Sequence, residues 1–206
     1  MSTKTASLDL VKLVINSVLS RKESKCVTFD ILNFYLQTPL DHPEYVCINI
    51  SDISQDFIDE YDLLDSVWDG WVYFKINRGV YGLPQSGILA NKLLEESLAK
   101  HGYYQCNTTP GLWRHKWRPI LFSLIADDFG VEYVGNCHAH HLWDALKEHY
   151  DITENWEGDL YADINLKWDY TCTCRLTMDN YISNIRLKCN QPDPKKRQIY
   201  PYKHIQ

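Results

Sequence analysis

An apolar run at residues 121–125 leads within two residues to a pair of adjacent aspartates, Asp127 and Asp128, and strand-forming residues resume directly after the pair. Two such runs with a short connection predict a β-hairpin with both carboxylates at its tip. A third aspartate, Asp30, ends another apolar run far upstream. If these runs are neighbouring strands, the three carboxylates converge, and such oxygens suit hard divalent cations. An aspartate pair close to a glycine is also ordinary turn chemistry, so the pair alone does not decide the function.

Apolar periodicity and turn residues predict alternating helices and strands along the chain. The expected helices are 7–20, a short one after Tyr35, one near 55–61, 86–100 with an apolar face of Leu89, Leu93, Leu94 and Leu98, 139–150, and 178–189. The expected strands are 25–29, 45–50, 71–76, 112–116, 119–125, 129–134, 160–168 and 173–178, of which the last two should close the sheet. This order is a βαββαβ pattern, so we predict an α+β chain with a ferredoxin-like core. The same core serves many functions and identifies none by itself.

Three further segments accompany the aspartate pair. Residues 79–91 are GVYGLPQSGILAN, residues 30–36 are DILNFYL and residues 159–169 are DLYADINLKWD, while ADDFG at 126–130 contains the pair itself. In this order and spacing the four motifs resemble the reverse transcriptase of copia-type LTR retrotransposons, over residues 5–206. Any one motif alone is weak, and the four together are specific.

The resemblance implies that this is a segment of a retrotransposon polyprotein with RNA-directed DNA polymerase activity. Asp30, Asp127 and Asp128 would be catalytic and would bind two Mg²⁺ ions, with Mn²⁺ able to substitute, and the backbone carbonyl of Ile31 would be an additional ligand. One of the two metal ions would activate the primer 3′-hydroxyl, and the other would hold the triphosphate and the leaving pyrophosphate.

The resemblance also assigns residues to substrate contact. Tyr35, five residues after Asp30, would pack against the incoming sugar and exclude a ribose 2′-hydroxyl. The other assigned residues are Gln85, Gly87 and Arg78 for the incoming nucleotide, and Trp168 and Lys167 for the primer. From the residues alone, Tyr35 is rather interpreted as a core aromatic and Trp168 as a packing residue. The segment around Gln85 can as well be a proline-stiffened loop that opens a helix.

By the resemblance the whole chain is a partial reverse transcriptase domain. Its expected parts are a palm at 1–37 and 79–178, partial fingers at 38–78, and the start of a thumb or connection, or a linker, at 179–206. The expected partners are an RNA or DNA template with its primer and deoxynucleoside triphosphates. The remaining fingers, thumb, RNase H and integrase domains of the polyprotein are expected to be missing, since only 29 residues precede Asp30.

Charge and cysteine usage restrict these interpretations. The net charge of −6 is unfavourable for a nucleic-acid binder, although basic residues concentrate at 186–203. The seven cysteines are scattered and lack finger-like spacing, which favours reduced thiols over a zinc site. No signal peptide and no apolar run of membrane-spanning length is visible, so we expect no membrane partner and an intracellular, cytoplasmic location, including retroelement particles.

Two alternatives to an active polymerase remain at this stage. The first is an inactive remnant or interaction module that keeps the fold. The acidity of the chain, the short fingers and Asp163 favour it. Asp163 stands where a glycine is common, and its carboxylate would repel the primer phosphate. Ile125 stands where reverse transcriptases usually have an aromatic residue, a position that varies among copia-like relatives. The second is another two-metal enzyme such as a nucleotide cyclase, which residues 83–85 and Tyr35 disfavour.

Overall fold

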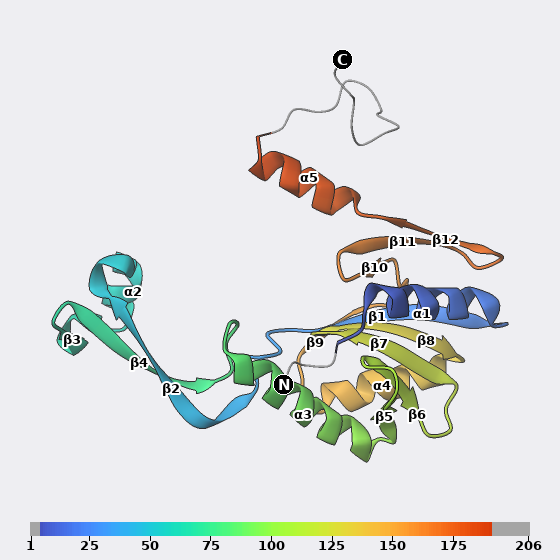
Figure 1. The fold of residues 1–206 in the computed structure, drawn as a ribbon, viewed down its shortest axis with the longest axis horizontal. Coiled ribbons are helices and arrows are strands. Elements are labelled where there is room, and N and C mark those ends of the chain that lie inside the picture. The colour runs from blue at the N-terminus through green and yellow to red at the C-terminus, as the bar shows by residue number, and fades with distance from the viewer. Residues whose placement is uncertain (1–4, 191–206) are drawn as a thin grey trace.

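A six-stranded antiparallel sheet organises the chain in the computed structural model, which describes residues 5–190 (Figure 1). In spatial order its strands are β5 (Tyr103–Gln105), β6 (Leu112–His115), β7 (Ile120–Ile125), β8 (Asp128–Val134), β1 (Ser24–Ile31) and β9 (Ile152–Asn155). The fold is therefore mixed α/β with antiparallel sheets. The hairpin β7–β8 and the strand β1 confirm the predictions for the segments that contain the aspartates.

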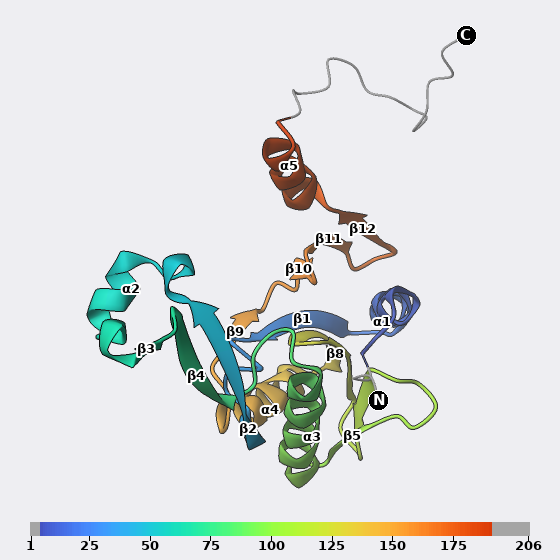
Figure 2. The same ribbon diagram turned by 60° about the vertical axis from the view of Figure 1, so that its left-hand side comes forward.

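Helices cover both faces of this sheet (Figures 1 and 2). Helix α1 (Leu8–Ser20) lies on one face, and α3 (Pro84–Lys100) and α4 (Asn136–Lys147) lie on the other. Side chains alternate between the faces of a strand, so Phe29 and its neighbours in alternate positions enter the core beneath α3 and α4, while Thr28 and Asp30 face the other way. The core on the α3 and α4 side includes Val27, Phe29, Ile31, Leu94, Leu98, Trp113, Phe122, Phe129, Val131, Leu142 and Leu146.

Helices α1 and α3 begin at residues that favour a helix start, and the predicted apolar face of α3 needs one correction. The Ser7 hydroxyl accepts a hydrogen bond from the Leu10 amide at 3.3 Å and caps α1. Pro84 opens α3 at its first turn, where a missing amide hydrogen is harmless. The predicted apolar face of α3 is wrong in part, because Leu93 is 38% exposed. The face that packs on the sheet instead includes Ser86, Ala90, Leu94, Ser97 and Leu98.

A three-stranded arm projects away from the main sheet (Figure 1). Its elements in chain order are β2 (Pro39–Asn49), η1 (Ile50–Asp52), α2 (Gln55–Glu60), η2 (Leu63–Ser66), β3 (Val67–Trp68) and β4 (Trp71–Arg78). Ile58, Leu63 and Val72 form a small core of its own. The paired strands and the short helix of this region are confirmed, although β2 begins earlier than expected. The short helix expected after Tyr35 is wrong, because residues 32–37 form turns.

The segment after the main sheet differs most from the prediction. The expected strand 160–168 is two strands, β10 (Leu160–Tyr161) and β11 (Ile164–Asp169), and with β12 (Thr173–Thr177) they form a separate sheet. The edge of the main sheet is occupied by β9, which was not predicted. Ala162 and Asp163 have φ values of 47° and 62°, which is the geometry of a tight hairpin turn.

Helix α5 (Asp179–Lys188) follows this sheet, as predicted. The remainder of the proposed thumb start or linker, from position 191 on, lies outside the described residues. Among residues 5–190, no helix combines the length and the apolar character that crossing a membrane requires.

Candidate metal centre

Strand register brings the three aspartates together. Asp30 and Asp128 are direct partners across the antiparallel pair β1–β8. Residues directly opposite each other share a face of the sheet, so both side chains project to the same side. Asp127 belongs to the two-residue turn that joins β7 to β8, and the Ile31 amide donates a hydrogen bond to its backbone carbonyl at 3.1 Å. This bond fastens the turn to the end of β1.

The turn before the aspartate pair has an unfavourable backbone. Ala126 has a φ of 52°, in the left-handed region that a residue with a β-carbon rarely adopts. Such strain persists where the surrounding structure fixes it, and it is typical of functional sites. Here the strained residue directly precedes Asp127 in the turn between β7 and β8.

The resulting cluster has the donor set of a site for hard cations. One carboxylate oxygen from each of Asp30, Asp127 and Asp128 lies within 4.8 Å of the others, and all three residues are partly exposed. Carboxylate oxygens at this spacing can share one or two divalent ions such as Mg²⁺. The arrangement therefore fits the ligand set that the sequence motifs imply for the side chains.

Burial, and after it the crowding of negative charge, raises the pKa values of two of the carboxyl groups. Burial, followed by repulsion from Asp30, Asp127 and Asp163, raises the pKa of Asp128 to about 7. Burial and the charge of Asp127 raise the pKa of Asp30 above its ordinary value, and a hydrogen bond from the Thr153 side chain acts in the opposite direction. Three ionised carboxylates are thus unfavourable together, and a bound cation would relieve the repulsion.

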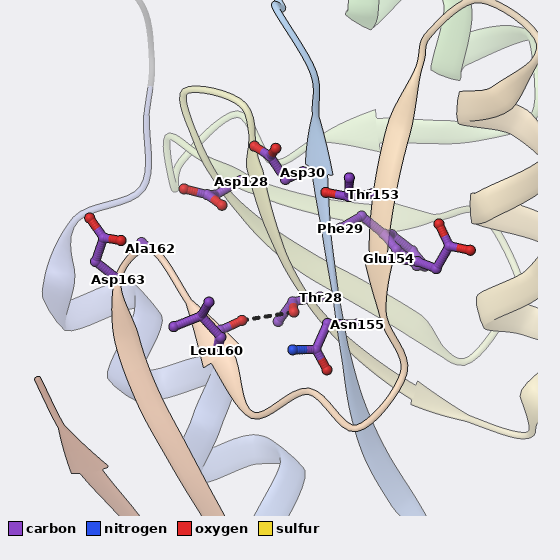
Figure 3. A pocket seen from close by; sticks show the side chains of 10 residues that line it. All are labelled: Thr28, Phe29, Asp30, Asp128, Thr153, Glu154, Asn155, Leu160, Ala162 and Asp163. Carbon is purple, nitrogen blue, oxygen red and sulfur yellow. Dashed lines mark hydrogen bonds between the residues drawn. The ribbon is translucent and has the colours of Figure 1, made fainter. Parts of the chain in front are cut away.

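A cavity of about 390 Å³ opens beside the cluster. Figure 3 shows Asp30 and Asp128 on their strands, with Asp163 facing them from the turn between β10 and β11. The Thr28 hydroxyl donates a hydrogen bond of 2.8 Å to the Leu160 carbonyl (Figure 3). This bond joins β10 to β1, and both residues line the cavity. Asp163, noted from the sequence as a departure, therefore adds a further negative charge to this cavity.

Two tyrosines lie close enough to the cluster for its charge to perturb them. Burial and then the Asp127 charge raise the pKa values of both Tyr35 and Tyr81. Their rings meet edge to face with centroids 4.9 Å apart. Tyr35 was assigned a site role from the sequence, whereas Tyr81 was not, although it belongs to the motif at 79–91. An aromatic residue directly before Gly82 was the signal that could have identified it.

Two of the residues assigned to the incoming nucleotide, Gln85 and Arg78, lie where the arm joins the main sheet. The Gln85 amide donates to the Glu44 carboxylate at 2.6 Å. Arg78 ends β4, and its guanidinium donates to the backbone carbonyls of Leu36 and Gln37 at 3.5 and 3.4 Å. Gly87 lies in the first turns of α3 and is partly exposed. These contacts fix Gln85 and Arg78 at the junction between the arm and the main sheet.

The residues assigned to the primer lie on β11. The Trp168 indole donates to the Gly158 carbonyl at 2.7 Å and stacks on Tyr170 with ring centroids 5.4 Å apart. Trp168 also packs against the cluster of Val11, Ile15, Tyr161 and Leu166, so it has a packing role in this structure. Lys167 points from the same strand and is exposed.

Tyr161 anchors the second sheet on the first, which the sequence did not indicate. Its ring is 3% exposed, and its hydroxyl donates to the Ser123 carbonyl and exchanges a hydrogen bond with the Ser123 hydroxyl, both at 3.0 Å. A β-carbon at Gly130 would lie 2.7 Å from this ring. Only glycine at position 130 allows the ring to approach β8 so closely, and the approach positions the turn with Asp163.

Comparisons with known proteins add little to this picture. The sequence matches no protein-family model and no curated protein. Two similar solved structures are the apo telomerase of Candida tropicalis, truncated from its C-terminal domain (TM-score 0.45, 11% identity), and the apo telomerase of the same organism (TM-score 0.44, 12% identity). Each covers 85% of this chain, which spans 41% and 37% of those chains. The copia-type resemblance stays a prediction from the motifs.

Proposed function

We propose that this chain is the palm, with partial fingers, of an RNA-directed DNA polymerase of a copia-type retroelement, which adds deoxynucleotides to a primer 3′-hydroxyl. One observation supports the proposal above all others. Asp30, Asp127 and Asp128 come from motifs far apart in the sequence, and the fold brings their carboxylates within 4.8 Å. Nucleotidyl transfer requires such a cluster, because charge develops on both the attacking and the leaving oxygen.

The topology around the cluster supports the same proposal. Strands β1, β7, β8 and β9 alternate with α3 and α4 in the chain as βαββαβ, and they lie in the spatial order β7-β8-β1-β9. This order supports the ferredoxin-like arrangement that we propose for a polymerase palm. In this assignment the palm comprises 1–37 and 79–178, and the arm at 38–78 is the partial fingers.

We assign different roles in the reaction to the residues of the site. Two Mg²⁺ ions, or Mn²⁺ in their place, would neutralise charge on the reacting oxygens, held by the three aspartates and the Ile31 carbonyl. Tyr35, supported by the edge of Tyr81, would limit the space beside the incoming sugar. The remaining proposed contacts are Gln85, Gly87 and Arg78 with the nucleotide and Lys167 and Trp168 with the primer.

Primer extension tests this function directly. The chain, incubated with an RNA template annealed to a labelled DNA primer, the four deoxynucleoside triphosphates and Mg²⁺, should lengthen the primer, and chelation of the cation should stop the reaction. The readout is product length on a denaturing gel. No extension with either Mg²⁺ or Mn²⁺, on a template–primer that the chain is shown to bind, would contradict the proposal for this chain.

The inactive remnant or interaction module remains the second candidate because of one observation. Asp163 faces the cavity that a primer end would occupy and adds negative charge there (Figure 3). Phosphate binding is weakened by a neighbouring carboxylate. Failure of the chain to bind any template–primer, together with rescue of binding by Asp163→Gly, would favour this second candidate over an active polymerase.

Divalent-cation affinity is expected to rise with pH up to about 7 and then level off. Asp128 must lose its proton to bind a cation, and its pKa is about 7 without one. Below that pKa each pH unit should therefore increase affinity by up to about ten-fold. Mn²⁺ titration calorimetry at several pH values below and above 7 measures how the affinity depends on pH. Asp128→Asn should remove most of this pH dependence. A wild-type affinity that is independent of pH would contradict the prediction.

The metal-free protein should show the opposite trend in stability. The folded state holds the Asp128 proton up to a pKa of about 7, whereas the ordinary value is 3.8. Between these values the folded state binds more protons than the unfolded state, so the free energy of unfolding falls as pH rises. The melting temperatures with and without Mn²⁺ should differ most above pH 7, where Asp128 has lost its proton.

A further inference from the structure

A second cavity, also of about 390 Å³, lies at the turn between β6 and β7. Strand β7 runs from this turn to the aspartate turn, so the two sites occupy opposite ends of the same sheet. Six residues at about 3.3 Å each separate them by roughly 20 Å. The second cavity therefore does not belong to the candidate metal centre.

The lining of this cavity is basic in a chain whose net charge is −6. Its charged side chains are Arg21, Arg114, Lys116 and Arg118, and no described residue that lines it is acidic. Arg21 approaches the buried Glu132 at 3.7 Å. Within residues 5–190, no ion pair shorter than 4 Å engages the other three. Their charge is available to an anionic ligand.

Exposed aromatic rings stand among these charges. Trp117 is 70% exposed and Tyr104 is 45% exposed. Tyr104 is the direct cross-strand partner of Arg114, so a ring and a guanidinium share one face at the edge of the sheet. Exposed rings occur elsewhere on this surface, such as Trp68. What distinguishes Trp117 and Tyr104 is that basic side chains line the same cavity.

The turn that contains Trp117 is fixed by hydrogen bonds to a buried histidine. His115 is 8% exposed, and its Nδ1 accepts hydrogen bonds from the amides of Trp117 and Arg118 at 3.2 and 3.1 Å. Its Nε2 donates to the His101 carbonyl at 2.9 Å. The indole is thus presented by a preorganised turn, and a ligand would lose little freedom of the protein on binding.

Arg118 is positioned by two contacts. Its guanidinium lies 4.3 Å from the centre of the Trp117 ring, and Nη1 donates to Nδ1 of His138 at 3.1 Å. Trp117 is 70% exposed despite this contact, so a second planar group can reach its ring. A nucleobase is such a group, and its phosphates would meet the cations around it.

We propose that this surface, formed by Arg114, Lys116, Trp117, Arg118 and Tyr104, binds a single strand of nucleic acid. Phosphates would contact Arg114 and Lys116, and a base would stack on Trp117. Cations that follow the backbone and rings that stack bases are the two components of such sites. An acidic peptide would use the cations but would have no planar group for the indole. The proposal needs neither a divalent cation nor polymerase activity.

The test is fluorescence anisotropy with a labelled single-stranded oligouridylate of about twelve nucleotides, in EDTA, over a series of salt concentrations. Each phosphate contact contributes about 0.7 to the slope of log affinity against log salt, so Arg114→Gln with Lys116→Gln should reduce the slope by roughly 1.4. Trp117→Ala should weaken binding about five-fold or more and leave the slope unchanged. All substituted side chains are exposed, and thermal melts verify that the variants fold.

Matched controls come from elsewhere on the surface. Trp68→Ala removes an indole that is 76% exposed on the arm, and Lys92→Gln removes an exposed cation on α3; neither should change binding by more than about two-fold. Every variant keeps the basic residues after position 190, so differences report on the proposed surface. Equal slopes for the wild type and the charge variant would overturn the proposal. So would a poly-glutamate peptide that competes as well as RNA while Trp117→Ala has no effect, because that outcome identifies an acidic-peptide site.

Discussion

Asp127→Asn should abolish divalent-cation binding and reduce primer extension by at least about 100-fold. The substitution removes one of the three carboxylates whose oxygens lie within 4.8 Å of one another. Charge stabilisation by bound metal is worth several kcal/mol in the transition state, and each 1.36 kcal/mol is a factor of ten in rate. Mn²⁺ titration calorimetry and the extension assay measure the two effects, and Asp30→Asn should behave in the same way.

Loss of binding can be separated from loss of folding. Removing one of three mutually repelling carboxylates should leave the metal-free protein at least as stable as the wild type. Burial is the main cause of the raised pKa of Asp128, and repulsion from Asp127, which adds to it, would be removed. Asp56→Asn, at an exposed position on the arm, is the matched control and should bind cations normally. Wild-type cation affinity in Asp127→Asn would show that the cluster is not the metal site.

Gly130→Ala should destabilise the fold by about 1–3 kcal/mol, the usual range for overpacking a well-packed site. The new β-carbon would meet the Tyr161 ring at 2.7 Å, and this ring is held by two hydrogen bonds to Ser123. Either β8 or the β10–β11 hairpin must move. Urea unfolding gives the change in free energy, and an unchanged midpoint would contradict the packing described here.

A double-mutant cycle identifies the cause of that destabilisation. Tyr161→Leu removes the ring atoms that the new β-carbon would meet and should itself be destabilising, because packing and hydrogen bonds are lost. If the clash is the cause, the double variant should lose less stability than the sum of the two single variants, with a coupling of about 0.5–3 kcal/mol. If the two destabilisations simply add, a clash with the Tyr161 ring is not the cause of the Gly130→Ala effect.

The aspartate cluster could be predicted because its signals are local. Each aspartate ends or follows an apolar strand, and pairing of those strands was enough to bring the carboxylates together. The role assigned to Tyr35 from motif position stays a prediction, and burial followed by the charge of Asp127 raises the pKa of its hydroxyl. Tyr81 was missed because its ring is 63% exposed and its proximity to the aspartates depends on how a loop folds back.

Features that depend on distant pairing were the ones predicted wrongly or not at all. Strand β9 has only one buried residue, Ile152, so its sequence lacks a strand pattern. The segment at 160–168 does have such a pattern, but a strand pattern does not specify which sheet the strand joins. The basic surface combines Tyr104 with residues near 114–118, and strand pairing in the sheet brings these together.

The separate small core of the arm has a consequence for how the molecule opens. The arm buries Ile58, Leu63 and Val72 among its own residues, and its strands pair with one another and not with the main sheet. The central strands β1 and β8 are buried between helices on both sides. Backbone opening should therefore occur as at least two cooperative units, and the arm should open at a lower free energy than the centre. The aspartate strands should therefore keep their backbone hydrogen bonds under conditions in which those of the arm already open.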